Sequence, residues 1–352
     1  MVREILKLKS SWEFLQETEL PVILYGTGNG ADKIIDELER LGVKLYGVTA
    51  SDGFVRKRQF RGFEVKALSD FENELEDFVV IIGFGTQRQE VIDNIISISK
   101  RHKVLVPCVP VYGDSIINRD FLKKNLLNIK AVYYELADKK SQEVYKDFLR
   151  FEFTGELEYL LRSETEKDEA FKDILQLTGA ESYLDLGAYR GDTVAEFLHY
   201  TNGCYDSITA VEPDKKSFEK LQDFAKDFNF CKLLNKGIWS EEKLLEFGSA
   251  LGRGNSISKG GESIEAVSVD SLCADSEFTY IKADIEGCEG EMLKGAQNTL
   301  EKLKPKLNIA AYHRSEDFFD IPLTIRQLNP EYKIYLRHHR YIPCWDMNFY
   351  CV

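Results

Sequence analysis

The chain has 352 residues, more than one hydrophobic core usually supports, and this length predicts two domains. A formal net charge of -13 argues against nucleic-acid binding, and no apolar run is long enough to cross a bilayer. Seven dispersed cysteines without a C-x-x-C pair argue against a disulfide framework or a zinc site. Because the first residues carry no signal-peptide apolar block, we expect a cytoplasmic protein without membrane insertion.

Residues 21 to about 110 have the pattern of a small α/β unit. A strand beginning at Val22 runs into the glycine turn Gly26-Thr-Gly-Asn-Gly30, and an amphipathic helix follows over 31–41. Further strands are predicted from Val43, Val79 and Lys103. Alternation of strands and helices is typical of a parallel sheet, so we predict a Rossmann-like domain over residues 1–114.

The first glycine turn has the context of a nucleotide-binding turn. The candidate residues are Gly26, Gly28, Gly30 and Asp52. The basic residues of 56–58 and Arg61 could meet the phosphates of a nucleotide or a nucleotide sugar. The alternative, which we favour slightly, is a scaffold or dimerisation module whose glycines serve turn geometry alone.

Residues 115–180 are charged and have apolar residues at helical spacing. Aromatic residues recur through this stretch, among them Tyr145, Phe148 and Phe151, and they argue for burial over a solvated linker. We therefore predict a helical connector over 115–180, between the first domain and a second one over 181–352.

The second domain opens with a strand, a glycine turn and a helix start. Asp185 and Gly187 end the strand that begins at Tyr183, and Gly191 and Asp192 precede the helix. Glycine lets backbone N–H groups approach a ligand, and a helix N-terminus favours anionic groups. Later strands are predicted to begin at Ile208, Cys231, Thr279, Leu307, Lys333 and Phe349, and a glycine-rich hairpin is predicted around 247–261.

Acidic residues follow two strands of this domain. Glu212 ends the second strand and could accept hydrogen bonds from both hydroxyls of a ribose. Asp284 and Glu286 end the fourth strand, where side chains face the ligand crevice of a parallel sheet. For Glu289 and Glu291 we favour a simpler role, in which they complement the dipole of the next helix.

Residues 182–352 resemble an S-adenosylmethionine-dependent methyltransferase of the FkbM type. The resemblance rests on Leu184-Asp-Leu-Gly-Ala-Tyr-Arg-Gly-Asp-Thr193, Val211-Glu-Pro-Asp214, Ile281-Lys-Ala-Asp-Ile-Glu-Gly-Cys-Glu289, Leu293-Lys-Gly-Ala296 and Lys304-Pro-Lys-Leu307. It implies a seven-stranded Rossmann-like sheet with the last strand antiparallel. It also implies S-adenosylmethionine as cofactor and O-methylation of a sugar. The cofactor-binding residues we predict are Asp185, Gly187, Ala188, Gly191, Asp192, Glu212, Pro213, Gly237, Ile238 and Asp284.

Methyl transfer to a sugar hydroxyl needs a base because the hydroxyl is a poor nucleophile. His313 is the first candidate, and Asp284 and Glu286 are the alternatives. A core histidine bonded to the backbone explains His313 about equally well. The same three side chains could hold a divalent cation, which we rank below a metal-free mechanism. The residues predicted to contact the substrate are Arg314, Arg337, His338 and His339.

The sequence thus predicts a methyltransferase that acts on a carbohydrate or nucleotide sugar of a surface polysaccharide, with a homodimer as one possible assembly. Two rivals stay open at this point. One is a nicotinamide-dependent oxidoreductase that uses the turn at Gly26, although no Tyr-x-x-x-Lys constellation supports it in that domain. The other is a noncatalytic binding or assembly protein that retains both folds.

Overall fold

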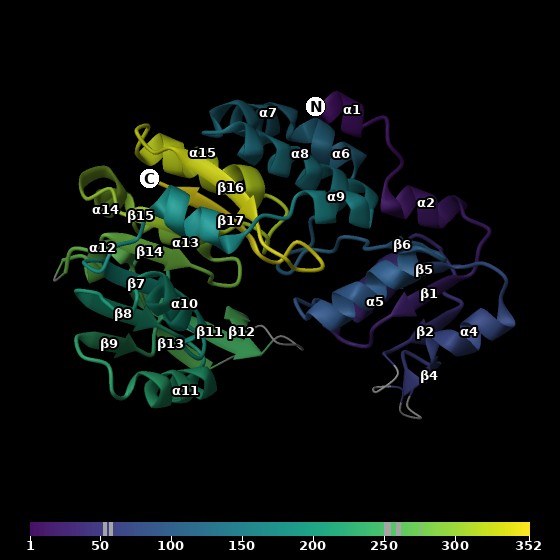
Figure 1. Ribbon diagram of the computed structural model, residues 1–352, viewed down its shortest axis with the longest axis horizontal. Helices are drawn as coiled ribbons and strands as arrows, with labels where there is room; N and C mark the ends of the chain where they lie inside the picture. The colour runs from purple at the N-terminus through teal and green to yellow at the C-terminus, as the bar shows by residue number, and fades with distance from the viewer. Residues whose placement is uncertain (52–54, 56–58, 250–254, 258–261, 275) are drawn as a thin grey trace. The chain divides into compact units, whose positions relative to one another are not determined.

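The computed structural model describes the whole chain except residues 52–54, 56–58, 250–254, 258–261 and 275 (Figure 1). Asp52, the basic residues of 56–58 and the tip of the glycine-rich hairpin therefore lie outside the described residues. The chain forms two compact units. Unit 1 contains residues 1–130, 143–164 and 338–346, and unit 2 contains residues 131–142, 165–337 and 347–352.

Unit 1 is built on a six-stranded sheet in the order β3-β4-β2-β1-β5-β6. All neighbouring pairs are parallel except β3 and β4, which form an antiparallel hairpin. Every residue of the central strands β1 and β5 is buried, as both faces of a parallel sheet require. The strands are β1 Val22–Tyr25, β2 Gly47–Thr49, β3 Gln59–Phe60, β4 Phe63–Lys66, β5 Val79–Ile82 and β6 Lys103–Leu105.

The β3–β4 hairpin was not predicted. Its turn places Arg61 at φ 51° and Gly62 at φ 84°, the two positive values that a two-residue hairpin turn requires. The helices of the N-terminal part are α1 Val2–Ile5, α2 Ser11–Glu17, α3 Asn29–Arg40, α4 Leu68–Glu74 and α5 Gln89–Ser99. Helix α3 follows the glycine turn directly, so the predicted strand–turn–helix order is confirmed.

The predicted connector is helical, and its helices contribute to both units. They are α6 Arg119–Lys124, α7 Leu126–Glu135, α8 Lys139–Thr154, α9 Leu157–Arg162 and the π-helix η2 Glu169–Leu175. The aromatic residues Tyr145, Phe148 and Phe151 are buried, as their recurrence predicts.

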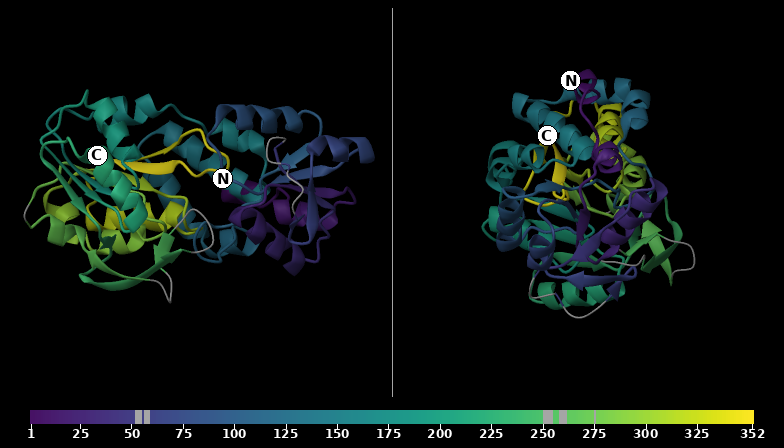
Figure 2. Two further views of the ribbon diagram at one scale, coloured as in Figure 1. Left: turned by 90° about the horizontal axis from the view of Figure 1, so that it is seen from below. Right: turned by 90° about the vertical axis from the view of Figure 1, so that its right-hand side faces the viewer.

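Unit 2 holds a seven-stranded sheet in the order β16-β17-β15-β14-β7-β8-β9, with helices on both faces (Figure 2). Strand β17 runs antiparallel to β15, and the pairs β15–β14, β14–β7, β7–β8 and β8–β9 are parallel. This confirms the predicted sheet with an antiparallel last strand. The strands are β7 Ser182–Leu186, β8 Ser207–Val211, β9 Cys231–Leu234, β14 Tyr280–Ala283, β15 Lys306–Ala310, β16 Ile334–His338 and β17 Met347–Cys351.

A second, four-stranded sheet in unit 2 has the order β10-β13-β11-β12. It consists of β10 Gly237–Ile238, β11 Lys243–Ser249, β12 Asn255–Ile257 and β13 Glu262–Val267. The helices of unit 2 are α10 Asp192–Tyr200, α11 Lys215–Ala225, α12 Val269–Leu272, α13 Glu289–Lys294, α14 Gln297–Lys302 and α15 Asp317–Leu328. No helix in the described part of the chain combines the length and apolar character that a membrane crossing requires.

Candidate active site

The glycine turn between β7 and α10 brings two parts of the chain into close backbone contact. Gly187 has a φ of 84°, and a Cβ added there would lie 2.0 Å from the carbonyl oxygen of Asp284. Gly191 has a φ of 93°, and a Cβ there would lie 2.3 Å from the Phe224 ring. Only glycine fits both positions. The turn after β7 therefore lies directly against the end of β14.

Asp185 is completely buried at the end of β7. Its Oδ2 accepts a hydrogen bond from the Thr193 hydroxyl at the start of α10. Its Oδ1 has no hydrogen-bond partner among the described residues. Burial raises the pKa of Asp185 to about 6, against the opposing effect of the nearby Lys282 charge. A buried acceptor without a donor is the kind of group that a ligand N–H can satisfy.

Glu212 follows β8, and both of its carboxylate oxygens accept backbone hydrogen bonds. Oε2 lies 2.8 Å from the amide of Tyr189, and Oε1 lies 2.8 Å from the amide of Asp214. Burial raises the pKa of Glu212 to about 7, although these two hydrogen bonds oppose the shift. Tyr189 itself has a φ of 47°, a strained value for a residue other than glycine. The carboxylate is fixed in place, and each oxygen keeps a free lone pair for a ligand hydroxyl.

These features fit a nucleoside-type cofactor. An unpartnered buried acceptor on β7, a turn that only glycine can form and a fixed acidic residue after β8 lie in one connected region. The other predicted cofactor residues occupy nearby positions of the same elements. Ala188 lies in the turn, Asp192 begins α10, Pro213 follows Glu212, and Gly237 and Ile238 form the buried strand β10.

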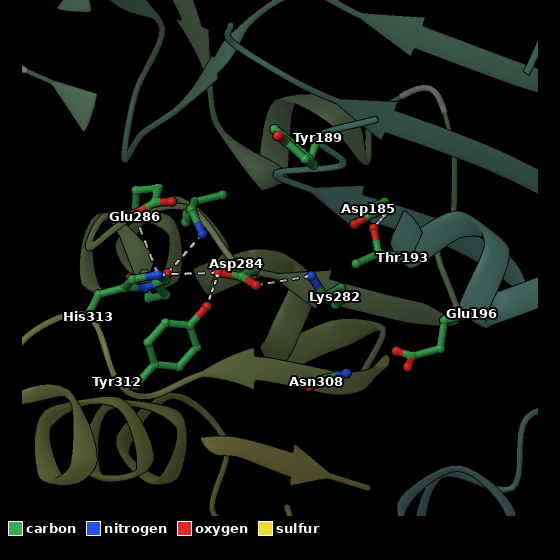
Figure 3. A network of polar contacts seen from close by, with 12 residues as sticks. Asp185, Tyr189, Thr193, Glu196, Lys282, Asp284, Glu286, Asn308, Tyr312 and His313 are labelled. Atoms are coloured by element: carbon green, nitrogen blue, oxygen red, sulfur yellow. Dashed lines mark hydrogen bonds and ion pairs between the residues drawn. The ribbon is translucent and has the colours of Figure 1, made fainter. Parts of the chain in front are cut away.

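Asp284 comes directly after β14 and lies between two cationic groups (Figure 3). Its Oδ2 is 3.5 Å from Nζ of Lys282, and its Oδ1 is 3.3 Å from Nε2 of His313. The Tyr312 hydroxyl donates to the same Oδ1 at 3.0 Å. Burial alone would raise the pKa of Asp284, but Lys282 and His313 overcome this and hold it well below its usual range. Asp284 is therefore a fixed anion.

His313 is buried between carboxylates. Its Nδ1 lies 2.9 Å from Oε1 of Glu289, and its Nε2 faces Asp284. Burial opposes the charged ring, but Glu289 and Asp284 raise the pKa of His313 well above its usual range. With a side-chain exposure of 1 %, this ring is an internal hydrogen-bond donor. This environment argues against the predicted role of His313 as the general base.

Glu289 has contacts with the candidate site that sequence reasoning did not predict. It is fully buried at the first position of α13, where its Oε1 also accepts a hydrogen bond from the Ile285 amide at 2.9 Å. Its position in the first turn of α13 agrees with the expected complement to the helix dipole, but its burial against His313 was not expected. The signal that could have found it is the pair formed with His313, which the sequence places 24 positions away.

Glu286 is the carboxylate of this group that is most open to solvent, with 43 % of its side chain exposed. Its φ of 52° is strained, and Gly287 follows with a φ of 88°. Its Oε2 lies 3.8 Å from Nε2 of His313. Burial of the carboxyl nonetheless raises its pKa. Strain at this point turns the Glu286 side chain toward the same group as Asp284 (Figure 3).

Three groups of this cluster, Asp284, Glu289 and His313, lie close enough together to hold a cation. The two carboxylates, however, lie against opposite nitrogens of the imidazole ring. The contacts are those of an imidazolium held between two carboxylates.

The four residues predicted to contact the substrate have internal partners. Arg314 donates from Nε to the carbonyl of Gly287 at 2.7 Å and so braces the turn that carries Glu286. The other three side chains, those of Arg337, His338 and His339, are at most 2 % exposed.

Arg337 forms ion pairs with Asp138 at 2.6 Å and Glu169 at 2.8 Å. His338 lies 2.9 Å from the Ser163 hydroxyl through Nδ1, and burial lowers its pKa to about 4. These partners account for the polar run at the end of β16. A substrate role for its members stays a prediction.

The glycines of the first turn, in unit 1, have packing roles of their own. A Cβ at Gly30 would lie 2.9 Å from the carbonyl oxygen of Gly83, and one at Gly26 would lie 2.9 Å from the Phe84 ring. Both are needed for close approach to the segment after β5. Gly28, which precedes α3, faces open space. Nucleotide binding at this turn stays a prediction.

The sheet order of unit 2 and the carboxylates at its strand ends define a Rossmann-like methyltransferase fold. Residues 185–342 match the family described as the methyltransferase FkbM domain. The predicted resemblance of this part of the chain to FkbM-type methyltransferases is confirmed. No curated protein matched the chain.

One solved structure shows the same fold, and two others are similar to part of the chain. A methyltransferase FkbM from Methylobacillus flagellatus is 21 % identical and superposes with a TM-score of 0.72, over 100 % of this chain and 93 % of that one. Aeropyrum pernix fibrillarin, solved with S-adenosyl-L-methionine, is 14 % identical with a TM-score of 0.36, over 51 % of this chain and 71 % of that one. An rRNA methylase from Streptococcus thermophilus is 12 % identical with a TM-score of 0.35, over 53 % and 92 %.

Proposed function

We propose that this protein is an S-adenosylmethionine-dependent O-methyltransferase whose acceptor is a sugar hydroxyl of a surface polysaccharide or of its activated precursor. The observation that carries the proposal is the contact between the glycine turn and the end of β14. Gly187 lies so close to the Asp284 carbonyl that no side chain fits between them. The cofactor-side turn and the acceptor-side carboxylates are therefore immediate neighbours, as transfer between two bound molecules requires.

The cofactor side supplies groups for each part of the donor. Bound S-adenosylmethionine would supply a methyl group on a positively charged sulfur. The unpartnered Oδ1 of Asp185 is an acceptor for its ammonium group, and the Glu212 carboxylate is an acceptor for its ribose hydroxyls. The two carboxylates also favour a cationic ligand electrostatically.

On the acceptor side, we assign the base to Glu286. Its carboxyl is partly exposed and burial raises its pKa, so it is a stronger base than an ordinary carboxylate. Asp284 is a weaker base because two cations lower its pKa, and His313 already carries its proton. Asp284 then orients the acceptor hydroxyl while Glu286 removes its proton, with the oxygen about 3 to 3.5 Å from the methyl carbon.

Hydroxyl-rich acceptors suit this surface. The exposed oxygens of Asp284 and Glu286 accept hydrogen bonds from hydroxyls and repel anionic groups. Tyr189, 45 % exposed in the glycine turn, offers an aromatic face to an apolar ring surface. Together with the family resemblance, these features favour a neutral sugar as the group that is methylated.

Calorimetric titration with S-adenosylmethionine tests the proposal first. We expect micromolar binding by the wild type. Glu212→Ala should lose this binding, because it removes the carboxylate that accepts hydrogen bonds from the ribose hydroxyls. Glu219→Ala, an exposed position on α11, is the control and should bind as the wild type does. A screen of activated sugars for methylated products follows. Absence of binding by the wild type would overturn the proposed function.

A further inference from the structure

A buried polar row crosses one face of the seven-stranded sheet at its centre. Lys282 on β14 pairs in register with Asp185 on β7 and with Asn308 on β15. Residues in register on neighbouring parallel strands point to the same face of a sheet. All three side chains are buried, at 7 %, 0 % and 3 % exposure. A buried ammonium is costly unless anionic or polar groups compensate it.

The surroundings of Lys282 are almost entirely acidic. Its Nζ lies 3.5 Å from Oδ2 of Asp284, and its charge also interacts with Asp185, Asp192 and Glu196. Asp185 belongs to β7, Asp192 and Glu196 belong to α10, and Asp284 follows β14. Figure 3 shows Lys282 between Asp284 and Asp185.

Two acceptors beside Lys282 lack donors. Oδ1 of Asp185 and Oδ1 of Asn308 are buried and have no hydrogen-bond partner among the described residues. Both residues are direct cross-strand neighbours of the lysine. The Lys282 ammonium carries three N–H donors, and Lys282 is in register with both residues.

We propose that Lys282 is a positioning residue that keeps Asp185 on the cofactor side and Asp284 on the acceptor side ionised at the same time. The identity of the two ligands rests on the proposed function. Two carboxylates on one buried face repel each other, and without a cation between them one takes up a proton. Burial already raises the pKa of Asp185 to about 6 with Lys282 in place. Without the lysine, Asp185 becomes neutral near physiological pH and loses its attraction for a cationic ligand.

The test compares Lys282→Met, Lys282→Arg and the control Lys306→Met. Lys306 begins β15 and forms an ion pair with Glu181 at 2.7 Å. Its removal therefore also takes a lysine away from a carboxylate at the same sheet. Affinity for S-adenosylmethionine is measured between pH 6 and pH 8.5. For Lys282→Met we expect affinity about fivefold lower at pH 6 and about twofold lower at pH 7, recovering to the wild-type value at pH 8.5, as a rise of about one unit from a pKa of about 6 gives.

Lys282→Arg should restore the wild-type profile because it keeps the charge, and Lys306→Met should leave the profile unchanged. An unchanged affinity in Lys282→Met, or the same loss at every pH, would overturn the inference. The second outcome would mean that the lysine contributes to packing only.

A ligand-free measurement separates this inference from the proposed function. The melting temperature of Lys282→Met should fall further below that of the wild type as pH rises from 6 to 8.5, because Asp185 must ionise without its cation. The loss in Lys306→Met should be nearly constant over this range, since Glu181 keeps hydrogen bonds from Thr178 and Thr279 and its pKa is lowered. A constant loss in Lys282→Met would refute the role even if the wild type bound no S-adenosylmethionine.

Discussion

Oε1 of Glu289 lies 2.9 Å from Nδ1 of His313, and both side chains are buried. The contact fixes the ring so that Nε2 faces Asp284 at 3.3 Å. Glu289 therefore contacts the candidate active site only indirectly, through His313 and then Asp284. It also anchors the turn after β14 through the Ile285 amide. A single carboxylate therefore connects the start of α13 with the acceptor-side carboxylates.

Removal of Glu289 should destabilise the fold strongly. Glu289→Ala leaves a buried imidazolium with one partner fewer, and loss of one member of a buried pair costs about 3–5 kcal/mol. Urea unfolding measures the free energy. Glu291→Ala is the matched control two positions along α13, where a half-exposed pair with Lys294 is worth about 1 kcal/mol or less. Equal losses in the two variants would contradict the buried pair.

The sequence predicted those features of unit 2 that depend on local pattern. Alternating strands and helices predicted the individual strands, and the resemblance to the FkbM type implied the seven-stranded sheet. The rule that ligands bind at the carboxyl ends of strands selected Glu212, Asp284 and Glu286. Glu212 and Asp284 directly follow recognisable strands, and Glu286 lies two residues after Asp284. Their placement needs no knowledge of distant contacts.

Contacts between residues far apart in the chain were not predicted. Arg337 was predicted to contact the substrate, and its partner Asp138, 199 positions earlier in the chain, was not expected. Lys282 lies inside a strand, and only the register with Asp185 shows that its charge faces another carboxylate. Glu289 has the spacing of an ordinary first-turn acid until the fold brings His313 against it. Pairing across the sheet and between loops is not encoded in local periodicity.

Gly187→Ala should be far more harmful than an alanine at another glycine of positive φ. The added Cβ would lie 2.0 Å from the Asp284 carbonyl oxygen, so the turn or the end of β14 must move. Gly203→Ala is the control, because Gly203 has a φ of 75° with open space around it and pays only the conformational cost of about 1–2 kcal/mol. We expect Gly187→Ala to exceed that loss in urea unfolding and to abolish S-adenosylmethionine binding. A loss no greater than in Gly203→Ala would refute the close backbone contact.

The buried Glu212 carboxyl should make both stability and cofactor affinity depend on pH. Its pKa is about 7 in the folded protein against an ordinary 4.5, so the folded state keeps a proton that the unfolded state releases in this window. Its contribution to stability therefore falls as pH rises from about 4.5 to 7. Affinity for S-adenosylmethionine should rise over the upper part of this window, because the ionised form accepts the ribose hydroxyls.

Titration calorimetry at pH 5.5, 6.5 and 8 measures the affinity, and thermal unfolding without ligand measures the stability. Glu212→Gln keeps the size of the side chain and removes its titration, so both profiles should lose the part near pH 7 and keep the part that Asp185 contributes near pH 6. An unchanged pH dependence in Glu212→Gln would assign the titration to another group, of which Asp185 is the nearest candidate by pKa.

Glu286→Gln should reduce turnover without loss of cofactor. The amide keeps the shape of the side chain but cannot accept the proton, and loss of a general base lowers the rate by about 10²–10⁴. Affinity for S-adenosylmethionine should stay within about twofold of the wild type, because Glu286 lies on the acceptor side. The acidic limb of the rate profile, which reports ionisation of the base, should disappear as well.

Steady-state kinetics with the acceptor found in the sugar screen measure these effects, and Glu301→Gln, an exposed position on α14, is the control. A small effect in Glu286→Gln together with a large one in His313→Gln would return the base to the histidine. That result would require His313 to lose its proton when the acceptor binds, against the attraction of Glu289 and Asp284. The pH dependence of the two variants decides between these assignments, because only the true base removes the acidic limb.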